Sequence, residues 1–282
     1  MSFFIKNTIA LFFLLISAGG AVAANPAPLK ISHSASMAPL SFINEEGKAD
    51  GILADLWKEW AKYSGKNIIF ELSDWKQALD STINGKAQIN AGLFYSDQRA
   101  GKLSYGDTLF SMKGALFAAN EIVIENSVNM QDTICGVLKG GYDKTFMTKH
   151  YPYTPLMLFN SIEDLFKTVS AGRIKLFVAD YPVAIYQLNE YGLEESFTNL
   201  KTLYTRELYP AVSKKNHELI QLINENMAAI PKQQKQRILR KWLNHEDKVA
   251  TSKYIGVISI IVILGLFLMH LPEVKRFIRF IK

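Results

Sequence analysis

An uncharged stretch near the C-terminus limits what this chain of 282 residues can fold into. Residues 254–271 read YIGVISIIVILGLFLMHL and contain no Lys, Arg, Asp or Glu. A helix of that length extends about 27 Å, which is close to the thickness of the hydrocarbon core of a bilayer. A helix buried inside a soluble domain is rarely apolar on every face over such a length. We therefore expect residues 254–271 to form a transmembrane helix.

The residues on either side of this stretch indicate its orientation. Residues 272–282 read PEVKRFIRFIK and carry four basic residues against Glu273 alone. Because basic residues next to a span favour the cytoplasmic side, this tail and the C-terminus are expected in the cytoplasm. Residues 245–253 have mixed charge and are expected to link the span to a domain outside the cytoplasm.

The N-terminus reads as a second targeting segment. Residues 1–24 contain one charge, Lys6, followed by an apolar run and then small residues. The sequence AVA at 21–23 fits the small-residue cleavage pattern of a secretory signal peptide, so we expect removal after Ala23 or Ala24. An uncleaved anchor helix is the alternative, although the apolar run is short for a span.

The net charge of +6 belongs mostly to these two ends. Lys6 contributes one unit and the residues after 253 contribute a net three, which leaves +2 on residues 25–253. A domain with so little net charge gives no reason to expect nucleic acid as a partner. The single cysteine, Cys135, excludes an internal disulfide and a cysteine-rich zinc site.

Predicted strands and helices alternate through the central domain. Strands are predicted at 29–33, 67–72, 87–93, 111–119, 134–138, 156–159 and 173–179. Helices are predicted at 52–64, 75–84, from about 143, and at 161–171, 181–190, 217–229 and 232–243. This alternation indicates α/β architecture with mostly parallel sheets. Because the pattern runs twice, we expect two lobes with a ligand cleft between them.

Arg99 is the first candidate for ligand binding. It lies in a loop just past a predicted strand, close behind Ser96. Ligands of open α/β sheets bind beyond the carboxyl ends of strands, where an arginine can hold a carboxylate through two parallel hydrogen bonds. The Ser96 hydroxyl and backbone N–H groups would supply further donors. The alternative is a surface arginine paired with Asp97 or Asp107.

Several short blocks follow one another in a recognisable order. They are MAPLSF at 37–42 followed by Glu46-Gly47, Gly51 and Asp55-Leu56, then Trp75 with Gly85-Lys86, AGLFYSDQR at 91–99, YGDTLF at 105–110, GVLKG at 136–140, GRIKLFVAD at 172–180 and KWL at 241–243. No block is specific alone, but their ordered combination resembles the family 3 solute-binding proteins over about residues 28–243. These are type 2 periplasmic binding proteins, also called Venus flytrap domains.

The resemblance implies a domain organisation. After the signal peptide at 1–24, residues 25–244 would form the solute-binding domain in the periplasm, tethered to the inner membrane. Lobe 1 would comprise about 28–111 and 207–244, and lobe 2 about 112–206.

The resemblance also implies roles for individual residues. In amino-acid-binding members, the residue matching Arg99 clamps the ligand α-carboxylate and the residue matching Asp180 takes the α-ammonium. Residues matching Gly92 and Ser96 offer backbone or hydroxyl contacts, and an aromatic residue near Trp75 walls the pocket.

A loop of lobe 2 completes the implied site. The Gly-Gly-Tyr stretch ending at Tyr142 would close over the ligand with backbone N–H groups at a helix start, which is a natural anion site. Two residues keep structural alternatives, because Asp180 could cap the helix from Tyr181 and Trp75 could be a core residue.

The sequence departs from the family pattern at several positions, including Gln88 and Lys175, where an Asp is common. Phe94 and Gly141 stand where Ser or Thr is common, while Ser34 and Met37 replace an early Asp and a Tyr. The charged pair implied above remains, so an amino acid or related carboxylate is the expected ligand, with its side-chain specificity open.

The leading hypothesis is a membrane-anchored receptor that signals by lobe closure, either as the sensor portion of a longer chain or through a partner in the membrane. One alternative is a tethered receptor that feeds an ABC-type amino-acid transporter. The other is a dehydratase-like enzyme on the same fold. The five histidines are scattered without metal-ligand spacing, and no nucleophile or phosphate-loop motif occurs, so we expect no catalytic residues, cofactor or metal.

Overall fold

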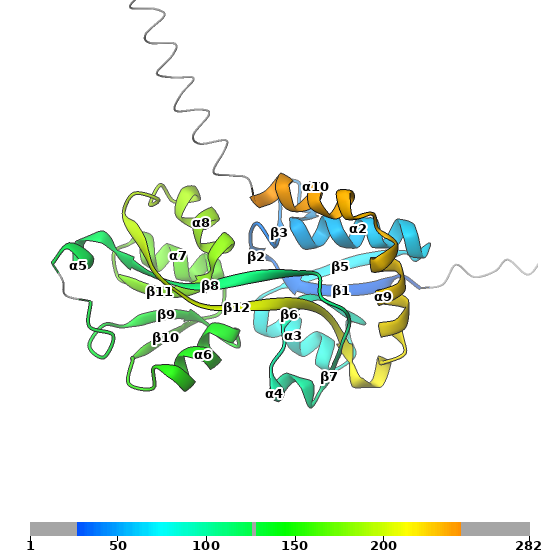
Figure 1. Cartoon of the computed structure of the whole chain (residues 1–282), viewed down its shortest axis with the longest axis horizontal. Coiled ribbons are helices and arrows are strands. Elements are labelled where there is room, and N and C mark those ends of the chain that lie inside the picture. Colours follow the sequence, from blue (N-terminus) through cyan, green and yellow to red (C-terminus); the bar gives the residue numbers. More distant parts are fainter. Residues whose placement is uncertain (1–26, 126–127, 244–282) are drawn as a thin grey trace, which may run out of the picture.

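The computed structural model describes residues 27–125 and 128–243 as two α/β lobes joined by long strands (Figure 1). The strands are β1 (Leu29–Ser34), β2 (Ser36–Met37), β3 (Ser41–Ile43), β4 (Ala49–Asp50), β5 (Ile68–Ser73), β6 (Ile89–Phe94), β7 (Leu103–Tyr105), β8 (Phe110–Ala119), β9 (Cys135–Leu138), β10 (Leu156–Phe159), β11 (Leu176–Asp180) and β12 (Phe197–Ser213). The α-helices are α2 (Ile52–Ser64), α3 (Trp75–Ile83), α4 (Asp97–Ala100), α5 (Asn120–Ile124), α6 (Tyr142–His150), α7 (Ile162–Ser170), α8 (Tyr181–Glu190), α9 (Leu219–Ala229) and α10 (Lys232–Leu243).

One large sheet runs through both lobes in the order β10-β9-β11-β8-β12-β6-β1-β5, with β7 paired to β12. In lobe 1, β1 pairs in parallel with β5 and β6, and in lobe 2, β9 pairs in parallel with β10 and β11. The two central strands run antiparallel to each other and to the neighbours on either side. Each lobe therefore has the expected parallel pairing, while the junction between lobes is antiparallel.

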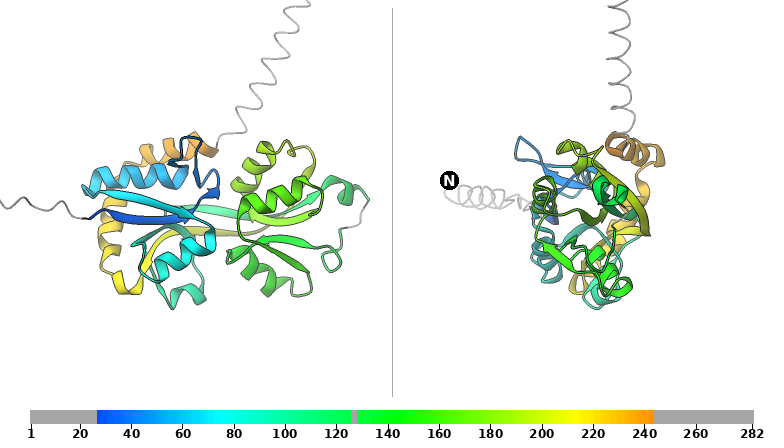
Figure 2. Two further views of the ribbon diagram at one scale, coloured as in Figure 1. Left: turned by 180° about the vertical axis from the view of Figure 1, so that it is seen from behind. Right: turned by 90° about the vertical axis from the view of Figure 1, so that its left-hand side faces the viewer.

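Strands β8 and β12 connect the lobes. Their register runs from Leu208 opposite Phe110 to Phe197 opposite Ala119, with bulges near Lys201 and Tyr204. The left view in Figure 2 shows the lobes at opposite ends of this pair. Any hinge motion between the lobes must therefore bend or twist these two strands.

Two tryptophans of α2 pack in the core of lobe 1 and connect α2 to neighbouring elements. The apolar face of α2 is fully buried at Trp57 and Trp60. Trp57 Nε1–H donates to the Ala91 carbonyl of β6 at 2.9 Å, and Trp60 Nε1–H donates to the Ile223 carbonyl of α9 at 3.2 Å. Each indole thus buries apolar area and also satisfies its polar group.

The last of the described helices, α10, is attached to lobe 1 through Asp55 of α2. Lys241 Nζ and Trp242 Nε1 both donate to Asp55 Oδ2, at 2.7 and 2.9 Å. The Lys241 ammonium also lies 4.4 Å from the centre of the Trp242 ring. Figure 1 shows α10 running along α2, with its C-terminal end near the boundary between the lobes.

The predicted elements lie within a few residues of the observed ones, but the sequence reading lacks several. It contains no element between 191 and 216, where β12 crosses both lobes, and it omits the small sheet of β2, β3 and β4. Among the described residues, no helix is long and apolar enough to cross a bilayer. The expected signal peptide at 1–24, linker at 245–253, span at 254–271 and tail at 272–282 lie outside the described residues.

Candidate ligand-binding cleft

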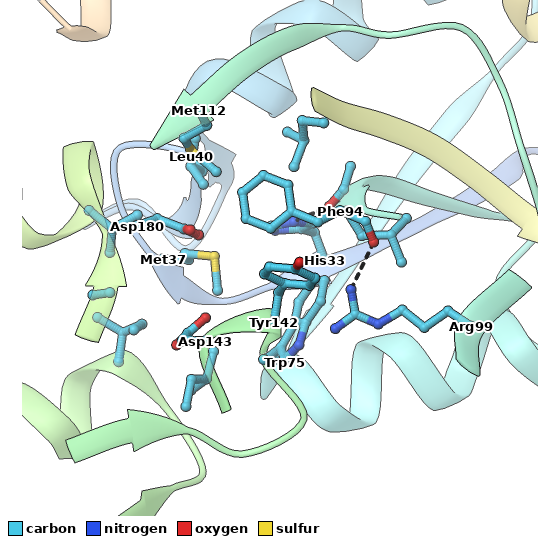
Figure 3. A pocket seen from close by; sticks show the side chains of 18 residues that line it. His33, Met37, Leu40, Trp75, Phe94, Arg99, Met112, Tyr142, Asp143 and Asp180 are labelled. Carbon is cyan, nitrogen blue, oxygen red and sulfur yellow. Dashed lines mark hydrogen bonds between the residues drawn. The ribbon is translucent and has the colours of Figure 1, made fainter. Parts of the chain in front are cut away.

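A cleft lies between the lobes, beyond the carboxyl ends of β1 and β6 (Figure 3). It encloses about 480 Å³ of unfilled space, part of which is open to solvent. Its lining includes His33, Met37, Leu40, Trp75, Gly92, Phe94 and Arg99 from lobe 1, Leu138, Tyr142, Asp143 and Asp180 from lobe 2, and Met112 and Leu208 from the connecting strands. Figure 3 shows the two carboxyl groups on one side and the Arg99 guanidinium on the other, with aromatic rings between them.

Arg99 is a buried cation, with 8% of its surface exposed. Its Nη1 donates to the Phe94 carbonyl at 3.0 Å, and its Nη2 donates across the cleft to the Gly140 carbonyl at 2.9 Å. Burial lowers the Arg99 pKa, but a guanidinium stays protonated at neutral pH. Because a guanidinium has five N–H donors, three remain for a ligand.

Ser96 does not line the cleft. Its hydroxyl accepts a hydrogen bond of 3.4 Å from the backbone N–H of Arg99 and so caps α4. A serine at the N-cap satisfies one of the unpaired N–H groups of the first turn. The structure thus gives Ser96 the task of orienting the short helix that carries Arg99.

Gly92 and Trp75 both line the cleft. A side chain at position 92 would require Leu208 to move, because a Cβ there would lie 2.9 Å from Leu208 Cδ2. Trp75 is the first residue of α3, and its Nε1–H donates to the Gly140 carbonyl at 3.1 Å. Trp75 therefore belongs to the core of lobe 1 and also contacts lobe 2.

Asp180 ends β11 and stands at the N-cap position of α8, but its side chain makes no capping hydrogen bond. Its Oδ1 is buried and has no hydrogen-bond partner in the described part of the chain. Burial, together with the nearby charge of Asp143, raises the Asp180 pKa well above its usual value, and Arg99 opposes the shift. A buried unpaired carboxylate oxygen in a cleft is a group that a ligand donor would satisfy.

Asp143 is a site residue that the sequence reading missed. It lies in the first turn of α6 and is 6% exposed. Burial raises its pKa to about 6, while backbone N–H groups, Arg99 and Tyr204 oppose the shift. The Tyr204 hydroxyl donates to Asp143 Oδ1 at a long 3.5 Å. In the sequence, an acidic residue just after a Gly-Gly turn is explained equally well as a favourable charge at the start of a helix. The sequence therefore does not reveal that this residue lies in the cleft.

His33 is neutral in this cleft. Burial lowers its pKa to about 4. Its Nε2 lies 2.9 Å from the Gly92 carbonyl oxygen, and its Nδ1 lies 2.6 Å from the Ser41 hydroxyl. Because a carbonyl only accepts hydrogen bonds, the proton sits on Nε2. His33 therefore adds no charge near pH 7.

The aromatic residues Phe94 and Tyr142 line the cleft, and Tyr204 packs against both of them. The Tyr142 and Tyr204 rings are 4.9 Å apart between centres, and Phe94 lies 5.7 Å from Tyr142 and 6.0 Å from Tyr204, all edge to face. Tyr142 thus contributes its ring, in addition to the backbone of its loop. A wall of this kind excludes water, which strengthens the interactions of the charged groups.

The charge of the cleft depends on the protonation of its two acids, since burial raises the pKa of both. Arg99 faces two carboxyl groups, Asp143 and Asp180, and the histidine is neutral. When both acids are ionised, the cleft carries a net charge of −1. Within the residues that the structure describes, no group of three or more His, Cys, Asp and Glu side chains is arranged to hold a metal.

Two α/β lobes joined by a strand pair, with a charged cleft between them, define a two-lobed ligand-binding protein of the type 2 periplasmic class. Residues 29–245 match the Bacterial extracellular solute-binding proteins, family 3, and the chain belongs to this family. It is similar to the histidine-binding periplasmic proteins of Salmonella typhimurium and Escherichia coli, with 24% identity over 172 residues. This match covers 59% of the chain and 66% of those relatives, which is slightly less than two thirds of their length.

Solved structures share the fold. A histidine kinase sensor domain with similarity to periplasmic binding proteins superposes with a TM-score of 0.70 at 19% identity, covering 78% of this chain and 97% of that domain. An ancestral arginine-binding protein bound to arginine gives 0.70 at 21% identity, covering 77% and 99%. An ancestral amino-acid-binding protein described as a precursor of cyclohexadienyl dehydratase gives 0.68 at 21% identity, covering 77% and 95%.

Proposed function

We propose that this domain captures a small amino-acid-like solute with a net positive charge in the interlobe cleft, and that the lobes close around it. The observation that carries the proposal is the buried Oδ1 of Asp180, which has no hydrogen-bond partner among the described residues. An ammonium group of the solute would supply that partner. The charge balance of the cleft and the histidine- and arginine-binding proteins among the relatives support a basic amino acid as the solute.

Each charged group has a role in this proposal. Asp180 takes the α-ammonium, and the free N–H groups of Arg99 take the α-carboxylate. Asp143 takes a second cationic group, which an uncharged side chain would lack. Both acids then lose their protons to become full counter-charges, because a nearby cation lowers the pKa of a carboxyl group.

We further propose that the domain is anchored in the inner membrane by residues 254–271 and signals by lobe closure. The proposed lobe limits at 111/112 and 206/207 fall within β8 and β12. The fold of the histidine kinase sensor domain supports a sensory role. Delivery of solute to a membrane transporter is the alternative, and discovery of a permease partner would favour it.

We infer binding without catalysis. The relatives are mostly described as binding proteins, which supports this view, while the dehydratase precursor is the comparison that favours the enzyme alternative. Mass spectrometry of candidate solutes after incubation with the chain distinguishes the two, because only an enzyme would release a changed product.

A thermal-shift screen of the purified chain against amino acids tests the binding proposal. A basic amino acid should raise the melting temperature, because a ligand that binds only the folded state stabilises it. Asp180→Asn should reduce the affinity by about 100-fold, since the loss of a hydrogen bond to a charged group in a buried site costs about 2–3 kcal/mol. Arg99→Ala should abolish the shift.

Exposed residues of the same types supply matched controls. Asp97→Asn and Arg173→Ala remove equivalent charges from the surface and should leave the affinity unchanged. A solute whose binding is indifferent to both Asp180→Asn and Arg99→Ala would refute this site. A preference for neutral or acidic amino acids would refute the role given to Asp143.

A further inference from the structure

A second hollow lies between the lobes, on the side of α8 and α10. It encloses about 950 Å³ of unfilled space, open solvent included, which exceeds the space in the ligand cleft. Its walls are the Pro39-Leu40 turn, the start of β8, the first turns of α8, and the end of α10 with Trp242. We call it the α8–α10 groove. Phe42 packs against two walls of the groove. The centre of its ring lies 6.3 Å from that of Tyr186 on α8 and 5.7 Å from that of Trp242 on α10.

The lining of the α8–α10 groove has a simple chemistry. Four aromatic side chains face it, namely Phe110, Tyr181, Tyr186 and Trp242, together with prolines and aliphatic residues. Among the described residues of the lining, Lys113 alone carries a charge. Lys113 forms no ion pair within residues 27–125 and 128–243. A large, mainly apolar space with a few polar groups, here Lys113, Ser111 and the tyrosine hydroxyls, is typical of a small-molecule site.

We propose that the α8–α10 groove is a second binding site, for an aromatic carboxylate. The ring would lie among the four aromatic side chains, and the carboxylate would pair with the Lys113 ammonium. Burial raises the pKa of Tyr186, and two nearby acids, Glu190 and Asp50, raise it further, but neither acid belongs to the lining. The charge that a ligand meets on the groove wall is therefore positive, the reverse of the ligand cleft.

The two spaces share part of their walls. Leu40 and Met112 line both the ligand cleft and the α8–α10 groove, and Figure 3 shows these two side chains together at one edge of the cleft. The groove also has walls from both lobes and from a connecting strand. A molecule in it would therefore touch the parts that move during closure, so occupancy of one space should change the affinity of the other.

Calorimetric titration of the full-length chain with phenylacetate and indole-3-acetate tests this proposal. Both carboxylates should bind, and the neutral probes phenylacetamide and indole should bind at least about fivefold more weakly, the factor that one exposed ion pair of about 1 kcal/mol provides. Lys113→Gln should remove this preference. Lys201→Gln, which removes an exposed lysine from β12, should leave it intact.

A second pair of variants locates the bound probe. Ile185→Trp adds a large side chain to the groove wall and should abolish binding of the carboxylates, while Met157→Trp, on the exposed edge strand β10, should not. Asp180→Asn should retain binding of the carboxylates, which separates this site from the proposed amino-acid site. Absence of binding, equal binding of the neutral probes, or binding that is indifferent to both Lys113→Gln and Ile185→Trp would overturn the proposal.

Discussion

At the scale of single residues, the carbonyl of Gly140 is where the two lobes make their polar contact beside the ligand cleft. It accepts hydrogen bonds from Trp75 Nε1 and Arg99 Nη2, both of lobe 1. Gly140 has a φ of 75°, a left-handed backbone conformation that residues other than glycine rarely adopt. The glycine therefore allows the turn that presents this oxygen to two donors at once.

Replacing Trp75 by Phe should weaken ligand binding about three- to tenfold. The variant keeps an aromatic wall but loses the hydrogen bond to Gly140, which contributes about 0.5–1.5 kcal/mol to the closed arrangement. Calorimetric titration with the cleft ligand measures the effect. Trp60→Phe is the matched control, because its lost bond to Ile223 lies within lobe 1. An unchanged affinity in Trp75→Phe would contradict the role of the Gly140 contact.

Individual site residues could be predicted only in part. Arg99 follows a predicted strand and Asp180 ends another, so both were accessible from sequence as cleft residues, although their roles stay predictions. Ser96 was assigned to the ligand because it is polar and close to Arg99, but three-residue spacing also suits a helix cap. Asp143 could not be found, since its burial depends on packing of α6 against β12 through Tyr204.

At the scale of elements, a glycine on β8 makes room for an aromatic ring of the neighbouring strand β12. Gly114 pairs with Asp180 of β11 on one side and with Tyr204 of β12 on the other. The Tyr204 ring covers the face of Gly114 where a side chain would stand. Because Gly114 has no side chain, the Tyr204 ring has room to reach Asp143.

Gly114→Ala should lower the free energy of unfolding by about 1–3 kcal/mol, because the new methyl group overlaps the Tyr204 ring and forces it to move. Urea unfolding measures this loss, and weaker binding of the cleft ligand should accompany it. Gly101→Ala is the control, since the nearest atom to its Cβ would be 3.8 Å away. Equal stability of the two variants would show that Tyr204 does not depend on Gly114.

Strand β12 shows why part of the fold could not be read from the sequence. Its N-terminal half, Phe197 to Thr202, is largely exposed and contains polar residues in succession, without the alternation that marks a half-buried strand. Pairing with β8 makes it a strand, and β8 lies some 80 residues earlier in the chain. Helices such as α2 and α7 were predicted well, because their apolar faces are encoded within one local segment.

At the scale of the whole molecule, the two buried acids should make stability depend on pH. In the folded chain the Asp143 pKa is raised to about 6 from an ordinary value near 3.8. Folded protein therefore holds this proton more tightly than unfolded protein does. Its contribution to stability is complete below about pH 4 and is lost as the pH rises through about 6.

Asp143→Asn removes this loss, so the variant should gain stability over the natural chain as the pH rises. The difference should be small near pH 4 and reach on the order of 1–3 kcal/mol above pH 7, by linkage. Urea unfolding without ligand, between pH 4 and 8, measures it. The pKa of His33 is lowered to about 4, so His33 gives stability the opposite dependence on pH. This contribution is present in both chains and cancels in the difference between them. Parallel stability curves would contradict the assignment.

Because α10 is attached to Asp55, it stays with lobe 1 in any motion of the lobes. Because Lys241 and Trp242 are tied to α2, the chain beyond Leu243 starts from a point fixed on lobe 1. Relative to that point, lobe 1 is fixed and lobe 2 is the part that moves. In the proposed closure, the parts of lobe 2 that lie farthest from the hinge strands would travel farthest, while α10 would stay with lobe 1. A label pair that reports solute arrival should therefore place one dye on α10 and the other on lobe 2.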